Sequence, residues 1–338
     1  MLRSRVLIAL GAVAALALLG GAAAAGLLGH PGGAGPRTGS ASPSPSPVAP
    51  AAPSGTGTPA PVPGASGSEE FTLVSGGIAR TYRVHTPAGL PPEAPLVVML
   101  HGGGGSAAVA EQYYGWDQEA DREKFVVAYP DGLGPVEPAW NTGGGCCGYP
   151  ARNDIDDVRF IQDMVAAIGS RIPLDDRRIY AAGISNGGIM AYTLACRTDL
   201  FAAIGPDSAT MLGTCETPAP TSVIHIHGLQ DTTIPFDGGT GTGPAAIDGP
   251  PVPAVIDQWR AVDRCAPATS TTAGVVTTAV GTCAEGRAVE LVTIADGGHG
   301  WPGSPVKAGR STAGGNQPSE ALDATGTIWR FFAAHPKP

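Results

Sequence analysis

The chain has 338 residues, of which 50 are glycine and 33 are proline, and its formal net charge at pH 7 is −9. The part from Glu69 onward contains 17 basic and 29 acidic side chains, which gives it a net charge of −12. This negative charge, together with the lack of a basic cluster in the sequence, argues against binding to nucleic acid and disfavours strongly anionic substrates.

The first 29 residues have the features of an export signal. Arg3 and Arg5 supply a positive start, an uncharged apolar run follows from Val6, and small residues at 22–25 offer an A-x-A cleavage site. The run from Val6 to Leu28 is also long enough to span a bilayer, so an uncleaved anchor is the alternative. We therefore expect a secreted protein, which associates with the membrane at the cell surface only if this segment is retained.

Residues 30–68 consist almost entirely of proline, alanine, glycine, serine and threonine. Such a segment has too little apolar surface to offset the entropy lost on ordering, so we expect an extended, disordered linker. The remaining residues, 69–338, are enough for a single globular domain with a substantial core. The functional site is therefore expected in this domain.

The domain begins with a predicted hairpin, at residues 71–85 around Ser75–Gly77, and continues with apolar runs that alternate with helical patterns. Continuous apolar runs, typical of strands buried on both faces, lie at 95–100, 125–130, 177–183, 222–228 and 288–296. Helical patterns lie at 156–168, 186–196, 253–265 and 319–335. The alternation predicts βαβ units, and hence an α/β fold with a mostly parallel central sheet flanked by helices.

All six cysteines lie in this domain. With an export signal, an even number of cysteines predicts disulfide bonds, and the spacings do not fit a zinc site. A bridge between Cys265 and Cys283 is expected, because these residues flank one Thr/Val-rich segment. Three pairings remain open for the other four, Cys146, Cys147, Cys196 and Cys215.

The stretch Ile179–Met190, IYAAGISNGGIM, places Ser185 between a predicted strand and a predicted helix. Such a strand–turn–helix is the setting of the nucleophile in the G-x-S-x-G motif. Gly183 and Gly187 fit this interpretation, because a side chain at either position would crowd the turn. A helix from Asn186 would direct its unpaired N–H groups and positive dipole end at the serine. We therefore interpret Ser185 as a nucleophile and not as an ordinary loop serine.

A serine nucleophile needs a general base, and His299 is the candidate. It lies in GGHGWPG, just after the last predicted strand, where the chain order Ser…Asp/Glu…His requires the histidine. His225 and His227 alternate within a predicted strand and precede the candidate acid, so we interpret them as packed residues. His101 opens a run of glycines and is interpreted as part of the loop architecture.

The base in turn needs a carboxylate that fixes its tautomer and stabilises its imidazolium form. Asp231 lies a few residues beyond a predicted buried strand, and between Ser185 and His299 in the chain. Three later aspartates are weaker candidates, since they lie in a glycine-rich segment, a Pro/Gly loop and a helix: Asp237, Asp248 and Asp257. The predicted triad is therefore Ser185, Asp231 and His299.

The loop MLHGGGGSAA follows the first predicted buried strand. Its glycines Gly102, Gly103 and Gly104 would let backbone N–H groups turn toward a developing oxyanion. Together with the N–H of Asn186, they would supply the donors of an oxyanion hole.

These motifs together resemble those of the secreted esterases grouped as polyhydroxybutyrate depolymerases and feruloyl esterases, which have the α/β-hydrolase fold. The resemblance covers about residues 69–338 and rests on LHGGGG, AWNTGGGCCGYPARNDIDDVRFI, IYAAGISNGGIMAYTLAC, IHIHGLQDTTIPFDGG and GGHGWPG. It implies the same triad, and it implies that Trp140, Asn141 and Trp301 lie near the substrate pocket. Core packing is an equal alternative for the two tryptophans. The chain shows no appended substrate-binding module, which disfavours an insoluble polyester as substrate.

The expected function is hydrolysis of a carboxylic ester through an acyl-enzyme, without a metal or another cofactor. The resemblance implies a hydroxyalkanoate ester or a hydroxycinnamoyl ester of a polysaccharide, and the residues do not separate the two. Acyl transfer to a cell-surface sugar through the same triad is one alternative. A non-enzymatic surface protein on the same scaffold is another, which an intact triad disfavours.

Overall fold

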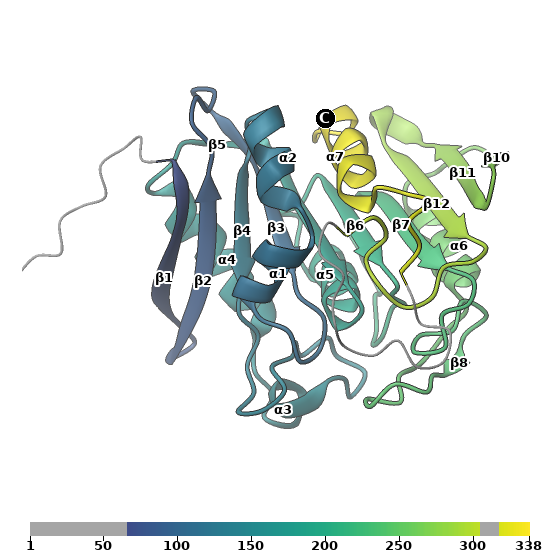
Figure 1. Ribbon diagram of the computed structural model, residues 1–338, viewed down its shortest axis with the longest axis horizontal. Helices are drawn as coiled ribbons and strands as arrows, with labels where there is room; N and C mark the ends of the chain where they lie inside the picture. Colours follow the sequence, from purple (N-terminus) through teal and green to yellow (C-terminus); the bar gives the residue numbers. More distant parts are fainter. Residues whose placement is uncertain (1–65, 305–317) are drawn as a thin grey trace, which may run out of the picture. The chain divides into compact units, whose positions relative to one another are not determined.

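The computed structural model describes residues 66–304 and 318–338 (Figure 1). The expected export signal at 1–29 and the expected linker, up to residue 65, lie outside the described residues. Within the two described stretches, no helix is long and apolar enough to cross a membrane.

A large mixed sheet organises the described part of the chain. Its strands are β1 (Gly67–Ser75), β2 (Ile78–Thr86), β3 (Ala94–Leu100), β4 (Val126–Pro130), β5 (Leu174–Ile184), β6 (Ala203–Asp207), β7 (Ser222–Gly228), β10 (Thr269–Ala273), β11 (Val276–Thr282) and β12 (Ala288–Ile294). The order in these described residues is β1-β2-β4-β3-β5-β6-β7-β12-β11-β10. The six strands from β4 to β12 in this order run parallel to one another. At one edge β1 pairs antiparallel with β2 and β2 with β4, and at the other β12 pairs antiparallel with β11 and β11 with β10. A small separate sheet pairs β8 (Gly239–Thr240) with β9 (Asp248–Gly249).

The central strands are apolar at successive positions because both of their faces are buried. Along β3, Leu96, Val98 and Leu100 pack into one hydrophobic cluster, whereas Val97 and Met99 pack into another. Neighbouring residues of a strand point to opposite faces of the sheet, so a strand covered on both sides needs an apolar residue at each position. The continuous apolar runs of the sequence therefore correspond to central strands of the sheet.

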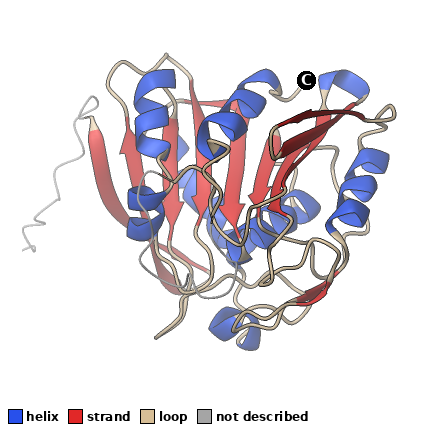
Figure 2. Cartoon of the chain, turned by 45° about the vertical axis from the view of Figure 1, so that its right-hand side comes forward, coloured by secondary structure: helices blue, strands red, loops and turns tan. Residues whose placement is uncertain are grey.

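Helices cover both faces of this sheet (Figure 2). Their bounds are α1 (Ala107–Tyr113), α2 (Trp116–Glu123), α3 (Gly148–Arg152), α4 (Asp157–Gly169), α5 (Asn186–Arg197), α6 (Val252–Val262) and α7 (Ala324–Ala334). Residues of α4, α5 and α6 belong to one hydrophobic cluster, and residues of α1, α2 and α7 belong to the other. The predicted α/β fold with a mostly parallel sheet between helices is therefore confirmed.

Three strands of the sheet were not expected from the sequence. β6 is short and contains Gly205 and Pro206, which do not form a continuous apolar run. A Cβ at Gly205 would lie 2.7 Å from Cγ2 of Ile328, so this glycine lets α7 pack directly against the strand. The residues of β10 are exposed, and the alternating Thr-rich hairpin of β10 and β11 carries no buried apolar pattern.

Three disulfide bonds are present in the described residues. The expected bridge joins Cys265 to Cys283. Of the three pairings left open for the other cysteines, the structure has Cys196 bonded to Cys215 and Cys146 bonded to its neighbour Cys147. The first of these ties the end of α5 to the loop that follows β6.

Candidate active site

The predicted triad residues follow three parallel strands at the same edge of the sheet. Ser185 follows β5, Asp231 lies in the loop after β7, and His299 lies in the loop after β12. The strands β5, β6, β7 and β12 are consecutive in the sheet, and neighbouring strands lie about 4.8 Å apart. The carboxyl ends of parallel strands meet at one edge, which is where open α/β sheets hold their functional residues.

Ser185 occupies a strained turn between β5 and α5. Its backbone has φ 56° and ψ −125°, in a region that side-chain-bearing residues rarely adopt and that costs about 1–3 kcal/mol. The Ser185 N–H donates to the Asp207 carbonyl at 2.9 Å, which fixes the turn against β6. A Cβ at Gly183 would lie 2.4 Å from the Gly187 carbonyl oxygen, and a Cβ at Gly187 would lie 2.3 Å from that of Leu100. The turn therefore requires glycine at both positions.

Asp231 and His299 are hydrogen-bonded to each other. Oδ2 of Asp231 lies 2.7 Å from Nδ1 of His299. The other carboxylate oxygen, Oδ1, accepts the backbone N–H groups of Thr233 at 2.8 Å and Ile234 at 2.9 Å. The Asp231 side chain is fully buried, whereas that of His299 is 16% exposed. If the carboxylate is ionised, this arrangement assigns a proton to Nδ1 of His299 and leaves Nε2 free to accept one.

In the described residues, the Ser185 hydroxyl makes no hydrogen bond to His299. Hydrogen bonds between catalytic groups are often long in unliganded enzymes and tighten when substrate binds. Of the competing aspartates, Asp257 pairs with Arg260 at 3.2 Å on the surface, Asp248 lies in β9, and Asp237 is exposed. Of these carboxylates, the one placed against His299 is that of Asp231.

The glycine loop after β3 lies against the Ser185 turn. A Cβ at Gly102 would lie 3.5 Å from Cβ of Ser185, and a Cβ at Gly103 would lie 3.9 Å from Cβ of Asn186. Asn186 is the first residue of α5, so its N–H has no acceptor within the helix. The N–H of Gly104, which the sequence suggested as a donor, instead donates to the Pro138 carbonyl at 2.8 Å.

His101 fixes the orientation of this loop. Its Nε2 accepts the Gly132 N–H at 2.9 Å, so its Nδ1 carries the proton and donates to the Gly102 carbonyl at 2.7 Å. Burial lowers the pKa of His101, which keeps the ring neutral and compatible with this pattern. Because the carbonyl and the N–H of one trans peptide point in opposite directions, the N–H of Gly103 is turned away from the His101 ring.

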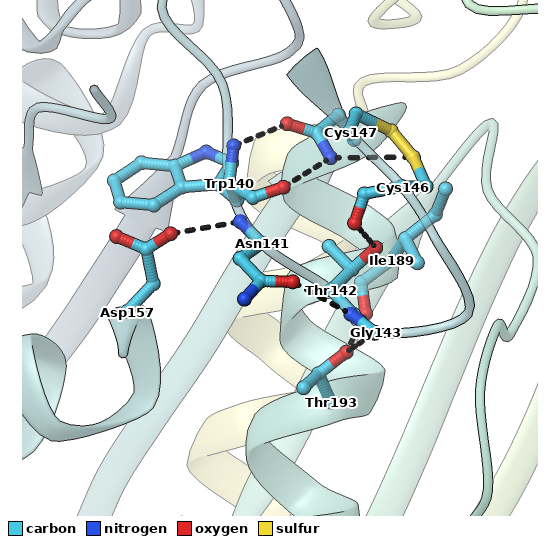
Figure 3. The surroundings of a disulfide bond; sticks show 10 residues. Trp140, Asn141, Thr142, Gly143, Cys146, Cys147, Asp157, Ile189 and Thr193 are labelled. Carbon is cyan, nitrogen blue, oxygen red and sulfur yellow. Dashed lines mark hydrogen bonds between the residues drawn. A yellow bond between two sulfur atoms is a disulfide. The ribbon is translucent and has the colours of Figure 1, made fainter. Parts of the chain in front are cut away.

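The three residues suggested for a substrate pocket make hydrogen bonds to other residues of the chain. Trp140 is fully buried and donates its Nε1–H to the His101 carbonyl at 2.9 Å. Figure 3 shows Asn141 beside it, with its N–H donating to Oδ2 of Asp157 at 2.7 Å. Trp301 is 3% exposed, and its Nε1–H donates to Oγ1 of Thr325 at 2.9 Å. For both tryptophans the structure agrees with the alternative of interior packing.

Asp157, which accepts the Asn141 N–H, also forms a buried ion pair that the sequence did not indicate. Its Oδ1 accepts a hydrogen bond from Arg80 at 2.8 Å, and both side chains are almost completely buried. Burial raises the pKa of Asp157, and the neighbouring Arg80 opposes that rise. In the sequence, Asp157 lies at the start of the predicted helix at 156–168, and its ion pair could not be foreseen because Arg80 lies 77 positions away.

Asp207 is a second buried carboxyl that sequence reasoning missed. It ends β6, and its backbone carbonyl accepts the Ser185 N–H. Burial, and secondarily the nearby Asp231, raise the pKa of Asp207 well above its ordinary value, which favours the neutral acid. In residues 66–304 and 318–338, no three His, Cys, Asp or Glu side chains are placed to hold a metal ion.

Comparison with known sequences places the chain among esterases. A family model described as Esterase PHB depolymerase matches residues 80–234, which include Ser185 and Asp231. Feruloyl esterase B of Piromyces equi is 30% identical over 220 residues, which are 61% of this chain and 39% of that protein. A protein of Nocardia uniformis subsp. tsuyamanensis, provisionally named esterase NocK, is 32% identical over 263 residues, 68% of this chain and 73% of that protein. The chain thus spans well under half the length of the first relative.

Comparison with solved structures agrees at the level of the fold. The acetyl xylan esterase from Aspergillus awamori matches with a TM-score of 0.54 at 14% sequence identity, over 79% of this chain and 99% of that one. At this identity the likeness shows the fold alone. It is the α/β-hydrolase fold that the sequence motifs imply.

Proposed function

The chain belongs to the esterase family described as PHB depolymerase, and on this premise we propose that it is a secreted serine carboxylic ester hydrolase. The observation that carries the proposal is the 2.7 Å hydrogen bond between Asp231 and His299, at the sheet edge that also bears the strained turn of Ser185. A buried carboxylate, a partly exposed imidazole and an elbow serine are the groups that acyl transfer through a serine requires.

In the acylation step, Oγ of Ser185 attacks the ester carbonyl carbon while Nε2 of His299 accepts the hydroxyl proton. Asp231 holds the imidazole in the required tautomer and stabilises the imidazolium that forms. The N–H groups of Asn186 and Gly103 face the carbonyl oxygen as it becomes an oxyanion, and each such donor lowers the barrier by about 3–4 kcal/mol. The C–O bond of the ester then breaks, and the alcohol leaves with the proton from His299.

In the deacylation step, water attacks the carbonyl carbon of the Ser185 acyl-enzyme. His299 again accepts a proton, now from the water, and the same N–H groups hold the oxyanion. The acid product leaves, and the proton returns to Oγ of Ser185. The cycle needs no group beyond those of the chain and the water.

The substrate that we propose is an ester of a hydroxyalkanoic acid or a hydroxycinnamoyl ester of a polysaccharide. The family description names PHB depolymerase, and several relatives are named feruloyl esterase. The net charge of −12 over residues 69–338 favours neutral substrates over polyanions. Secretion is supported by the apolar start of the chain and by disulfide bonds, which persist in oxidising compartments.

The nucleophile can be tested by labelling. We expect a fluorophosphonate probe to form one adduct, on the peptide that contains Ser185, and we expect Ser185→Ala to abolish it. Ser170→Ala, which changes an exposed serine at the end of α4, serves as the matched control and should label like the wild type. An adduct that persists in Ser185→Ala would overturn the assignment.

The substrate class can be tested with the full chain. Rates of hydrolysis of methyl ferulate, p-nitrophenyl acetate and 3-hydroxybutyrate oligomers, compared as kcat/KM, rank the two acyl classes directly. A sugar acceptor added to the acetyl assay distinguishes hydrolysis from transfer, because transfer produces an acetylated sugar in place of free acetate. Hydrolysis of none of these esters by a chain that binds the probe would contradict the proposal.

A further inference from the structure

A continuous line of buried hydrogen bonds lies behind Asp231. Oη of Tyr192, on α5, lies 2.8 Å from Nδ1 of His225, and Nε2 of His225 lies 3.0 Å from Nδ1 of His227. Nε2 of His227 lies 2.9 Å from the Ile234 carbonyl and 3.6 Å from Oδ2 of Asp231. That same Oδ2 atom lies against Nδ1 of His299. We call Tyr192, His225 and His227 the buried relay.

Only one placement of protons satisfies every contact in the buried relay. The Ile234 carbonyl can only accept, so Nε2 of His227 must carry a proton. Burial lowers the pKa of His227 to about 4, so the ring is neutral at neutral pH and its Nδ1 is an acceptor. Nε2 of His225 therefore donates to it, and Nδ1 of His225 accepts from the Tyr192 hydroxyl. Burial also lowers the pKa of His225 and raises that of Tyr192, which keeps both neutral.

The end of the buried relay holds the turn that carries Asp231. Ile234 donates its N–H to Oδ1 of Asp231 at 2.9 Å and accepts the Nε2–H of His227 at its carbonyl. One peptide segment thus connects the histidine to the carboxylate. The Nε2–H edge of His227 also faces Oδ2 of Asp231, the oxygen that is bonded to His299. Removing the donor of His227 would leave the Ile234 carbonyl without its partner and free this turn to move.

Packing alone does not account for three polar side chains at these positions. Tyr192, His225 and His227 are fully buried, and burial of a polar group is unfavourable unless it is hydrogen-bonded. Apolar side chains would fill the same space between α5 and β7 without that requirement. A polar line that ends at a carboxylate has a use that an apolar filling lacks, since its dipoles are oriented toward the negative charge.

We propose that His227, supported by His225 and Tyr192, is a positioning residue that holds Asp231 in place against His299. The proposal rests on the esterase mechanism proposed above and assigns a role to residues outside the triad. His227 does not touch the substrate or the reacting atoms. Its effect is therefore on the rate of the chemical step, through the geometry of Asp231 and His299, and not on substrate binding.

Steady-state kinetics of two variants test this role. His227→Leu removes both ring nitrogens, and we expect kcat to fall by about 10- to 100-fold with KM unchanged, the range measured when a partner that orients a metal-bound ligand is lost. His227→Gln keeps an N–H donor and an acceptor oxygen, and we expect it to recover most of the loss. Wild-type kcat in His227→Leu, or equal impairment of the two variants, would overturn the proposal.

Tyr192→Phe provides a variant that removes one hydroxyl and changes little else, in case His227→Leu does not fold. It leaves Nδ1 of His225 without a donor at the far end of the relay. We expect a fall in kcat that is smaller than in His227→Leu, with KM unchanged. A wild-type kcat in Tyr192→Phe, or a raised KM in that variant, would contradict a role in positioning.

Nitrogen NMR of the histidine side chains tests the relay without any assay of activity. The proton placement requires that His225 and His227 are neutral and protonated at Nε2 at neutral pH. A ring that carries its proton at Nδ1, or that is doubly protonated, would overturn the proposal even if the protein is an esterase. Conversely, an active Ser185→Ala variant would contradict the proposed function without affecting the measured tautomers. Failure of the relay proposal and failure of the proposed function are therefore distinguishable.

Discussion

The side chain of Asn186 holds the backbone of Trp140 on both sides: its Oδ1 accepts the Trp140 N–H at 2.7 Å, and its Nδ2 donates to the Trp140 carbonyl at 3.2 Å. Asn186 is also the first residue of α5, so its backbone N–H has no acceptor within the helix. One residue therefore joins the start of α5 to the loop that contains Trp140 and the Cys146–Cys147 disulfide.

Asn186→Ala is expected to lower stability more than kcat. The substitution leaves the buried N–H of Trp140 without a partner, which costs about 1–3 kcal/mol, whereas the Trp140 carbonyl keeps its hydrogen bond from the Cys147 N–H and the backbone N–H of residue 186 is retained. Urea unfolding followed by circular dichroism measures the loss. Asn153→Ala, at an exposed asparagine that bonds the Tyr149 carbonyl, is the control and should stay within about 0.5 kcal/mol of the wild type. Equal stabilities of the two variants would contradict this interpretation.

Asp231→Asn is expected to reduce kcat by about 10⁴-fold, the loss seen when the acid of another serine triad is made an amide. The reason is that an amide can donate to Nδ1 of His299 and so favours the wrong tautomer. Hydrolysis of p-nitrophenyl acetate measures the effect. Asp237→Asn changes an exposed aspartate six positions on and should retain the wild-type rate. A larger loss in the Asp237 variant than in the Asp231 variant would show that the acid has been misassigned.

Gly187→Ala is expected to destabilise the fold by about 3 kcal/mol or more, because its Cβ would lie 2.3 Å from a backbone oxygen that cannot move aside. Gly169→Ala, at the last residue of α4, is the matched control. Its Cβ would have its nearest neighbour at 3.7 Å, so we expect a stability equal to or slightly above that of the wild type. Thermal unfolding of both variants checks the pair, and a Gly187→Ala protein as stable as Gly169→Ala would refute the crowding argument.

The free energy of unfolding is expected to fall as pH rises above the ordinary pKa of an aspartate, in part because of Asp207. Burial raises its pKa well above 3.8, so the folded chain keeps a proton that the unfolded chain has lost at higher pH. Folding then takes up a proton, and the free energy of unfolding falls by up to about 1.4 kcal/mol per pH unit above the unfolded pKa. Asp207→Asn is neutral at every pH, so its stability should depend less on pH. Urea unfolding at about pH 5 and about pH 8 compares the two slopes, and identical slopes would exclude this contribution.

The main frame of the fold was predictable because it depends on local patterns. Central strands such as β3 and β4 are apolar along their length, and α4 shows a helical stripe that begins after Asp156, whose side chain accepts the Arg159 N–H. β6 escaped prediction because its place between β5 and β7 is decided by packing against α7, which lies more than 100 residues away. The hairpin of β10 and β11 escaped prediction because its Thr-rich residues are mostly exposed or only partly buried and form no continuous apolar run.

In the candidate site, too, local motifs were predictable and contacts between distant residues were not. The turn at Ser185 was predictable from a five-residue motif. The places of Asp231 and His299 were predictable because each follows a recognisable strand. The supporting contacts come from distant positions: Gly104 to Pro138, Trp301 to Thr325, and Tyr192 to His225. His225 and His227 were interpreted as packed residues, and they are fully buried. What their alternation in the sequence did not indicate is that their ring nitrogens are joined to each other and to Tyr192.

The Cys196–Cys215 disulfide keeps the two parts of the chain linked after proteolytic cleavage between these cysteines. It closes a covalent loop that includes β6, so a single cut in this loop, for example after the exposed Arg197, releases no fragment. The nucleophile on one side of the cut and the acid and base on the other stay linked through the bridge. In an oxidising extracellular medium a nicked molecule would remain whole, and its two parts would separate only after reduction.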